Sequence, residues 1–292
     1  MKIGLIGAGR MGFTLGKHLS VYSKNAEDVC VMGYYSRQPD SAKKAAKFTD
    51  TKYYKDMKAL VQACDTIILT VPDGQIQTVF NEIKNSGIRL DGKTFIHTSG
   101  ALSSQIFSGM GNRISGYSIH PIYAVNSKTE SYKHFQNCYI TIEGEGRDKE
   151  QLIGLFKKMG HKVREISAEK KAEYHAAAVF VSNLAIGLYR MGTNLLSDCG
   201  FTKAEAQEAL MPLFANNADN MQKYGCDKAL TGPVSRNDVK TVEKHLKALD
   251  FDAETLEVYR LLSKQLCSDK NLEIIKKLDE GVNHEKNSYD IC

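Results

Sequence analysis

The chain begins with MKIGLIGAGRMG (residues 1–12), and this stretch decides the fold. The apolar residues before Gly7 predict a buried strand, and residues 13–22 predict a helix directly after the last glycine. Gly7, Gly9 and Gly12 stand between them at the spacing G-x-G-x-x-G. A strand, this turn and a helix, in that order, form the fingerprint of a dinucleotide-binding fold.

Each glycine of the turn has a separate expected role. Gly7 allows the tight turn, Gly9 lets a pyrophosphate approach the backbone, and Gly12 lets the helix pack closely on the strand. The free N–H groups of the first helical turn then face the phosphates, where the helix dipole favours negative charge. A glycine-rich turn without a ligand is the alternative. The residues expected to contact the dinucleotide here are Gly7, Ala8, Gly9, Arg10, Met11 and Gly12.

The composition is that of an ordinary globular protein, with 42% hydrophobic and 25% charged residues. A length of 292 residues favours two domains, because single cores stop growing near ~250 residues. The net charge of +5 favours a phosphorylated cofactor or an anionic metabolite. Lysines are spread along the chain, so we expect no nucleic acid partner.

The cysteines indicate a reducing compartment. All seven are scattered, without a C-x-x-C pair or a histidine at ligand spacing, so we expect free thiols and no metal site. The first predicted strand starts at residue 2, which leaves no room for a targeting segment. No apolar run approaches the ~20 residues of a membrane span. We therefore expect a cytoplasmic protein that does not enter the membrane.

The end of the second predicted strand, residues 29–35, selects the cofactor. An NAD site expects an acidic residue there to accept a hydrogen bond from the ribose 2′-OH, but Ser36 and Arg37 occupy the position. A guanidinium can pair with a 2′-phosphate, so NADP(H) is preferred, and Lys43 and Lys44 can add to the same pocket. A solvated arginine in a turn is the alternative.

Strands and helices then alternate up to residue 166, which predicts an α/β domain with a doubly wound, Rossmann-type sheet. The further strands are expected at 66–71, 93–97, 116–119, 137–142 and 163–166, with helices at 56–64, 75–86 and 149–159. Ligands of such sheets lie at the carboxyl ends of the strands. The residues there that we expect to border the cofactor are Val71, Pro72, Asp73, Thr98, Ser99 and Gly100.

From Ser167 onward the pattern is helical, so the second domain is expected to be all-α. One helix of about 45 Å is predicted over residues 168–198. The other helices are expected at 202–224, 238–249, 253–267 and 272–278. The predicted domains are therefore 1–167 and 168–280, followed by a polar tail at 281–292 that we expect to be disordered.

The middle of the long helix is apolar nearly all round, at residues 176–181 and 184–186. Such a helix is buried on most sides, either in a bundle or at a subunit interface. Too little chain remains to cover it, so we expect a homodimer through the helical domain.

The same helix carries polar residues that can do chemistry. At 100° per residue, Lys171, His175 and Ser182 share one stripe, with Asn183 at its edge. Lys171 or His175 can protonate a developing alkoxide, Asn183 can bind the reacting carbonyl, and Ser182 can contact the substrate. A solvated lysine and a structural histidine are the alternatives.

Two further candidates lie elsewhere. The turn at residues 231–238 contains Arg236, which can hold a substrate carboxylate in a bidentate pair, and Asp238, a good helix N-cap. Both can equally serve only to build the loop. His120 and Pro121 follow a predicted strand end on the cofactor side, so they are candidate substrate contacts or a plain turn.

Several motifs together carry a resemblance over residues 2–268. They are Gly7–Gly12, Tyr35-Ser36-Arg37, Val71-Pro72-Asp73, His97–Leu102, His120-Pro121, Tyr174–Ala177, Ser182-Asn183, and Thr231–Pro233 with Arg236 and Asp238. The chain resembles a family with a Rossmann-like N-terminal half and a helical C-terminal half, related to pyrroline-5-carboxylate reductase and the 6-phosphogluconate dehydrogenase group. Within it, the chain is most similar to the alternative ketopantoate reductases of the PanG type.

The resemblance implies NADPH-dependent reduction of 2-dehydropantoate, a 2-oxo acid, to pantoate in pantothenate and coenzyme A biosynthesis. It implies proton donation from Lys171 or His175, Asn183 on the carbonyl, and Arg236 or backbone amides on the carboxylate. Classical ketopantoate reductases have asparagine one turn after the lysine, where this chain has His175, so their mechanism does not transfer directly. The alternatives are reduction of another 2-oxo acid or of a cyclic imine such as pyrroline-5-carboxylate, and a non-catalytic NADP(H)-binding regulator.

Overall fold

The computed structural model describes residues 1–280, apart from the side chain of Asn112. The chain divides between Asn183 and Leu184 into two compact units. This division lies later than residue 167, because the first part of the predicted long helix packs within the first unit. The tail at 281–292, expected to be disordered, lies outside the described residues.

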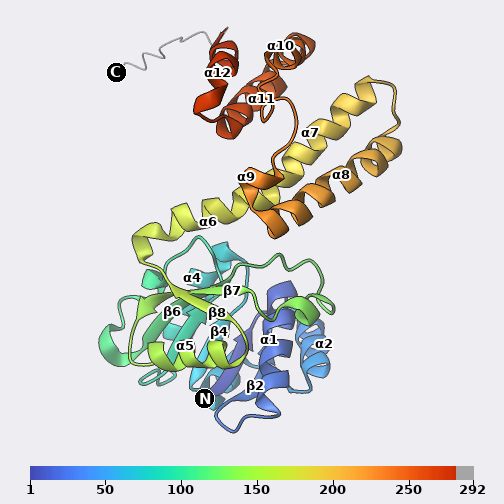
Figure 1. Cartoon of the computed structure of the whole chain (residues 1–292). Coiled ribbons are helices and arrows are strands. Elements are labelled where there is room, and N and C mark those ends of the chain that lie inside the picture. Colours follow the sequence, from blue (N-terminus) through green and yellow to red (C-terminus); the bar gives the residue numbers. More distant parts are fainter. Residues whose placement is uncertain (281–292) are drawn as a thin grey trace, which may run out of the picture. The chain divides into compact units, whose positions relative to one another are not determined.

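The first unit is built on one eight-stranded sheet with the order β3-β2-β1-β4-β5-β6-β7-β8 (Figure 1). Neighbouring strands are parallel, except that β6 and β7 are antiparallel. The strand order reverses between β1 and β4, as in the doubly wound sheet that was predicted. The strands are β1 (Lys2–Ile6), β2 (Cys30–Tyr35), β3 (Lys52–Tyr53), β4 (Thr66–Leu69), β5 (Thr94–His97), β6 (Ser115–Pro121), β7 (Tyr139–Glu145) and β8 (Lys162–Glu165).

Helices cover both faces of this sheet, because successive strand side chains point to opposite sides. Leu5 joins a buried cluster formed with α1, α2 and α5, whereas Ile6 joins a second cluster formed with α3 and α4. Both side chains are almost completely buried, which stabilises the fold by roughly 2 kcal/mol each. These helices are α1 (Arg10–Ser23), α2 (Pro39–Thr49), α3 (Met57–Ala63), α4 (Asp73–Lys84) and α5 (Lys149–Lys158).

The predicted helix at 168–198 is helical throughout but changes its winding. It consists of a 3₁₀ turn (Ala168–Lys170), α6 (Lys171–Val179), a π-helical segment (Phe180–Leu184) and α7 (Ala185–Asp198). Within the π segment the hydroxyl of Ser182 donates to the carbonyl of Ala178 at 2.7 Å. A π segment has more residues per turn than an α-helix. The spacing that placed Ser182 on one stripe with Lys171 and His175 is therefore wrong beyond Val179.

The apolar middle of this stretch is exposed at the junction of the two units. Phe180 is 65% exposed, Val181 is 81% exposed and Ile186 is 62% exposed. Burial in a bundle stays a prediction for these side chains. The alternative, a subunit interface, stays a prediction.

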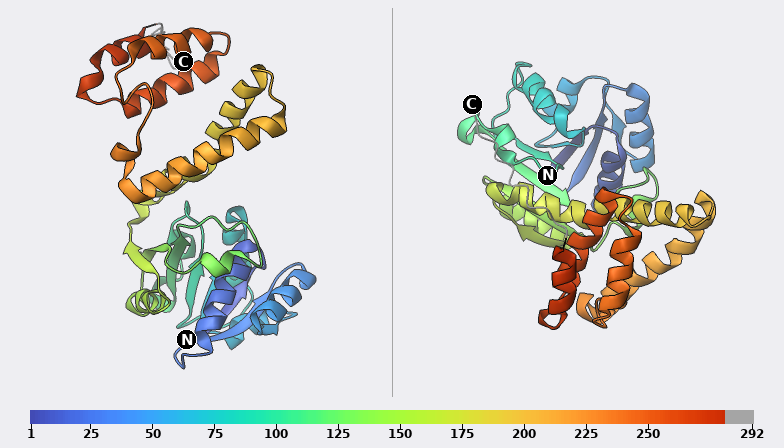
Figure 2. Two further views of the ribbon diagram at one scale, coloured as in Figure 1. Left: turned by 45° about the vertical axis from the view of Figure 1, so that its right-hand side comes forward. Right: turned by 90° about the horizontal axis from the view of Figure 1, so that it is seen from above.

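The second unit is helical, and no strand follows Glu165 among residues 166–280. Helices α7 and α8 lie side by side (Figure 2). A small core of Val242, Ile274 and Leu278 joins α10 to α12. None of the described helices combines the length and apolarity needed to cross a bilayer. Besides α7, the helices are α8 (Lys203–Tyr224), α9 (Cys226–Ala229), α10 (Val239–Ala248), α11 (Ala253–Leu266) and α12 (Leu272–Asp279).

Candidate active site

The glycine turn between β1 and α1 is packed against the end of β4. A Cβ on Gly7 would lie 2.7 Å from the carbonyl of Thr70, and a Cβ on Gly12 would lie 2.5 Å from the carbonyl oxygen of Gly7. Gly7 also has a φ of +109°, which side chains rarely adopt. At Gly9, a Cβ would meet no atom closer than 3.9 Å, so this face is open for a ligand. The geometry matches the three roles expected of the glycines.

Thr70, which the sequence analysis did not single out, fixes this turn. Its hydroxyl donates to the carbonyl of Gly7 at 2.9 Å, and its N–H donates to the carbonyl of Ile6 at 2.8 Å. Gly9 forms the N-cap of α1 without a side-chain cap, and no acidic residue lies in the first turn. The helix N-terminus is thus left for an anion, as a pyrophosphate site requires.

The residues after β2 carry positive charge without an acidic neighbour at the strand end. Arg37 is exposed, and no other side chain among residues 1–280 forms an ion pair with it. Ser36 accepts a hydrogen bond from the N–H of Gln38 at 3.3 Å. Lys43 pairs with Asp40 at 3.2 Å, and Lys44 is exposed. Arg37 and Ser36 can therefore hold a 2′-phosphate, with the two lysines nearby in α2.

A hydrogen-bonded link crosses the carboxyl ends of β4 and β5. The hydroxyl of Ser99 donates to Asp73 Oδ2 at 2.6 Å, just beyond Val71 and Pro72. The same oxygen accepts from the N–H groups of Ala101 and Leu102 at 3.2 and 3.0 Å. Ser99 is therefore fully used in fixing the loop beside the half-buried Thr98.

Lys171 is the most buried charged residue of this edge, with 2% of its surface exposed. Its Nζ donates to the carbonyl of Ser99 at 3.0 Å and to the hydroxyl of Ser118 at 2.5 Å. Burial lowers the pKa of Lys171 to about 8, although the carboxylates of Glu143 and Asp73 raise it in part. A group with this pKa can donate or accept a proton near neutral pH.

His97, at the end of β5, holds the same loop by two hydrogen bonds. Its Nδ1 accepts from the N–H of Ser99 at 3.3 Å, and its Nε2 lies 3.1 Å from the carbonyl of Ser103. These partners require the proton on Nε2. Burial lowers the pKa of His97 to about 4, so the ring is neutral at pH 7. Its role is structural.

Three aromatic side chains surround the lysine. His120 Nδ1 lies 2.6 Å from the hydroxyl of Tyr174, and the rings of His120 and His175 are 5.9 Å apart. Burial lowers the pKa of His120 to about 4, and the charge of Lys171 lowers it further. His175 Nδ1 is buried without a hydrogen-bond partner among the described residues. A Cβ on Gly100 would lie 2.4 Å from that atom, so glycine is required here.

The structure therefore brings Lys171, His175 and His120 together. His120 and Pro121 are part of β6, not of a turn after it, so that alternative is wrong. Tyr174, one residue before His175 on α6, belongs to the same group. No group of three or more potential metal ligands occurs within residues 1–280.

The other candidates are not part of this cluster's hydrogen bonds. Ser182 and Asn183 are exposed, and Ser182 Oγ lies 3.0 Å from Asn183 Oδ1. Arg236 is exposed on a loop of the second unit. That loop is held by Asn271, whose amide donates to the carbonyl of Val234 at 2.9 Å. The roles of Ser182, Asn183 and Arg236 stay predictions.

Two family models match parts of the chain. Residues 2–99 match a family described as NADP oxidoreductase coenzyme F420-dependent, and residues 138–266 match a domain of unknown function, DUF2520. The first match covers the glycine turn and Ser99, and it confirms the expected oxidoreductase with an NADP cofactor. The second covers Lys171, His175 and Arg236 but adds no activity. A comparison with curated protein sequences found no match.

Solved structures share the fold over nearly the whole chain. Protein TM1727 from Thermotoga maritima is 25% identical, with a TM-score of 0.71 over 90% of this chain and 96% of that one. Pyrroline carboxylate reductase from Plasmodium falciparum, solved with NADP bound, is 17% identical, with a TM-score of 0.55 over 92% and 98%. A reductive aminase from Aspergillus terreus, in complex with NADPH and ethyl-5-oxohexanoate, is 13% identical, with a TM-score of 0.60 over 90% and 92%. At the last two identities the likeness concerns the fold alone.

Proposed function

We propose that this chain is an NADPH-dependent reductase that acts on a carbonyl carbon, with ketopantoate as its substrate. One observation carries the proposal: a single sheet edge holds both the glycine turn and the buried Lys171, whose pKa is lowered by burial to about 8. Contacts link the two, from Gly7 to Thr70 after β4, and from Asp73 through Ser99 to Lys171. A hydride donor and a proton donor that act on one carbonyl group need this proximity.

The reduction needs the transfer of a hydride to the carbon and of a proton to the oxygen of the C=O bond. When bound, NADPH supplies the hydride that goes to the carbonyl carbon. Lys171 gives one proton to the oxygen, which becomes a hydroxyl, and it regains a proton from solvent after product release. Its bonds to Ser99 and Ser118 fix the direction of Nζ. His175, with a buried and unpartnered Nδ1, is the alternative donor.

The choice of ketopantoate rests on the motif resemblance and on the charge available for a carboxylate. Arg236 is exposed and has the planar fork that binds carboxylates in a bidentate pair. Asn183 and Ser182 would contact the carbonyl end, and His120 would line the site beside Lys171. A substrate with a 2-oxo acid group matches this set.

A cyclic imine is the second candidate substrate class. The fold is shared with a pyrroline carboxylate reductase and a reductive aminase. Lys171 would then protonate an imine nitrogen in place of an oxygen. A regulator that binds NADP(H) without turnover is the third candidate, but it gives no reason to bury a lysine beside the cofactor turn.

The test is oxidation of NADPH, followed at the nicotinamide absorbance, with ketopantoate, pyrroline-5-carboxylate and simple 2-oxo acids. Parallel assays with NADH test the Ser36-Arg37 site. Turnover confined to ketopantoate and NADPH supports the proposal. Turnover of the imine alone moves the function to the second candidate. Binding of NADPH without any turnover contradicts a reductase of these substrates.

We also propose that the chain forms a homodimer through the apolar surface defined by Phe180, Val181, Leu184 and Ile186, all of which are exposed. Exposed apolar surface of this kind marks an interface in a protein that stays in solution. The mass of the particle in solution, measured by light scattering, tests this.

A further inference from the structure

Glu143 lies directly across the sheet from the serine that binds Lys171. In the antiparallel pair of β6 and β7, Ser118 is opposite Glu143. Opposite residues of such a pair share one face, with Cβ atoms about 5 Å apart. Ser118 Oγ in turn lies 2.5 Å from Lys171 Nζ. A carboxylate and an ammonium therefore flank one serine.

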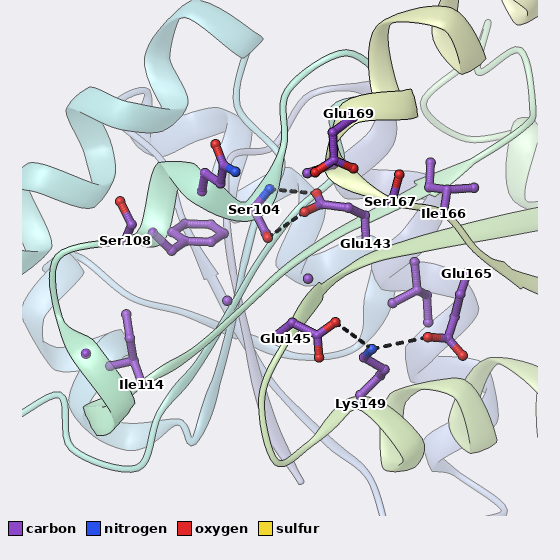
Figure 3. Close-up of a pocket in the computed structure, with 17 residues that line it drawn as sticks. Ser104, Ser108, Ile114, Glu143, Glu145, Lys149, Glu165, Ile166, Ser167 and Glu169 are labelled. Atoms are coloured by element: carbon purple, nitrogen blue, oxygen red, sulfur yellow. Dashed lines mark hydrogen bonds and ion pairs between the residues drawn. The ribbon is translucent and has the colours of Figure 1, made fainter.

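Glu143 is itself buried, with 5% of its surface exposed. Its two carboxylate oxygens accept from the N–H and the hydroxyl of Ser104, both at 2.7 Å (Figure 3). It lines a cavity of about 670 Å³ whose other acidic residues, Glu145, Glu165 and Glu169, are exposed. Glu145 and Glu165 pair with Lys149.

No lysine or arginine within residues 1–280 forms an ion pair with Glu143, and no carboxylate forms one with Lys171. Each is a buried charge without a direct counter-ion. A buried charge is costly unless a charge of opposite sign compensates for it. Lys171 and Glu143, on either side of Ser118, are the two buried groups that can compensate for one another.

The other groups around Lys171 do not replace this carboxylate. His97 and His120 are neutral at pH 7, and Tyr174 and His175 on α6 carry no negative charge there. Asp73, the second carboxylate, is exposed at the start of α4 and accepts from Ser99. Water and salt screen an exposed charge much more than a buried one.

We propose that Glu143 is a positioning residue that keeps the side chain of Lys171 protonated and in place for proton donation. This inference rests on the proposed function as far as donation is concerned. The charge relation between the two residues is independent of the substrate.

The first experiment observes Lys171 directly. Protein labelled with [ε-¹³C]lysine is titrated by NMR, and the Lys171 signal is identified by its loss in Lys171→Met. In the wild type we expect a midpoint of about 8. In Glu143→Gln, which keeps the size of the side chain and one oxygen to accept from Ser104, the midpoint falls by roughly half to one unit. An unchanged midpoint overturns the proposal.

The matched control is Glu145→Gln. Glu145 lies two residues further along β7 on the same face, but it is exposed and pairs with Lys149 at 3.1 Å. Its loss should leave the Lys171 titration unchanged. An equal shift in both variants contradicts a specific role of Glu143.

A second measurement needs no variant of Glu143, so it tests the proposal even if Glu143→Gln fails to fold. The wild-type titration is repeated in 1 M NaCl, where the screening length is about 3 Å. A midpoint that stays in place assigns the effect to buried Glu143. A midpoint that falls with salt assigns it to exposed Asp73 and overturns the proposal.

The pH profile of turnover then separates the inference from the function. A lysine that donates a proton loses activity as pH rises through its pKa. In Glu143→Gln this loss should begin at lower pH, so turnover above pH 8 falls about three- to tenfold relative to the wild type. If the NMR midpoint moves but the profile does not, Glu143 controls the charge of Lys171, and the role of Lys171 as donor is wrong.

Discussion

The two ends of one helical stretch differ in the burial of their side chains. At the start of α6 the charged Lys171 is buried, whereas Phe180 and Val181, immediately after α6, are exposed. The buried end is satisfied within its own unit, by Ser99 and Ser118. The apolar end has no such cover within its own unit. The first region is complete in one chain, and the second predicts a partner.

The largest expected effect comes from removing the buried charge. Lys171→Met should lower turnover roughly 10²- to 10⁴-fold, because the proton donor is lost while the stem of the side chain still fills its space. NADPH binding, measured by fluorescence, should persist, since neither hydrogen bond of Lys171 goes to the glycine turn at residues 7–12.

The matched control is Lys170→Met, one residue earlier. Lys170 is exposed and pairs only with Glu173. Its turnover should equal that of the wild type. Equal turnover in Lys171→Met would remove the lysine from the mechanism and leave His175 as the donor.

The buried region also depends on a glycine. In Gly100→Ala the new Cβ would lie 2.4 Å from His175 Nδ1 and 3.0 Å from the His120 ring. We expect a loss of about 1 to 3 kcal/mol in the free energy of unfolding, measured in urea. Gly154→Ala on α5 is the control, because its Cβ meets no atom within 4 Å. If Gly100→Ala and Gly154→Ala change the free energy of unfolding by the same amount, the side chains around Gly100 can move to make room for the added methyl group.

Much of the fold was predictable because its signals are local. Residues adjacent in the sequence determine the glycine turn, the apolar strands and the helix caps at Asp238 and Thr202. The two-residue β3 was missed because a strand of this length has no periodic pattern. The π segment was missed as well, because the apolar pattern of residues 176–186 does not distinguish a π-helix from an α-helix.

The site was predictable only in part. Lys171 and His175 stand one turn apart on a helix, so their spacing reveals them. Glu143 and His97 come from two different strands and meet this group only through sheet register and loop closure. A sequence read along one element cannot show such contacts across strands.

Acid should weaken the buried region by a measurable amount. Burial lowers the pKa of His120 from 6.5 to about 4, so the unfolded chain takes up a proton first as the pH falls. Stability contributed by the neutral ring is present above pH 6.5 and is lost between pH 6.5 and 4. Between pH 6.5 and 5 the wild type should lose about 1 to 2 kcal/mol more than His120→Gln.

Urea unfolding at a series of pH values measures this difference. The control is His134→Gln, because His134 is exposed and lies outside the group of residues around Lys171. Parallel curves for the wild type and His120→Gln would mean that water reaches the His120 ring.

The smallest expected effect tests the exposed end of the comparison. Val181→Glu places a charge in the apolar surface, and we expect the dimer to weaken about tenfold or more, which is about 1.4 kcal/mol. Light scattering over a dilution series measures the change. Val21→Glu, at an exposed valine on α1, is the control and should leave the mass unchanged. If Val181→Glu also leaves the mass unchanged, the exposed apolar residues serve something other than a second copy. We would then expect these residues to bind a partner of another kind, because burying exposed apolar side chains away from water lowers the free energy.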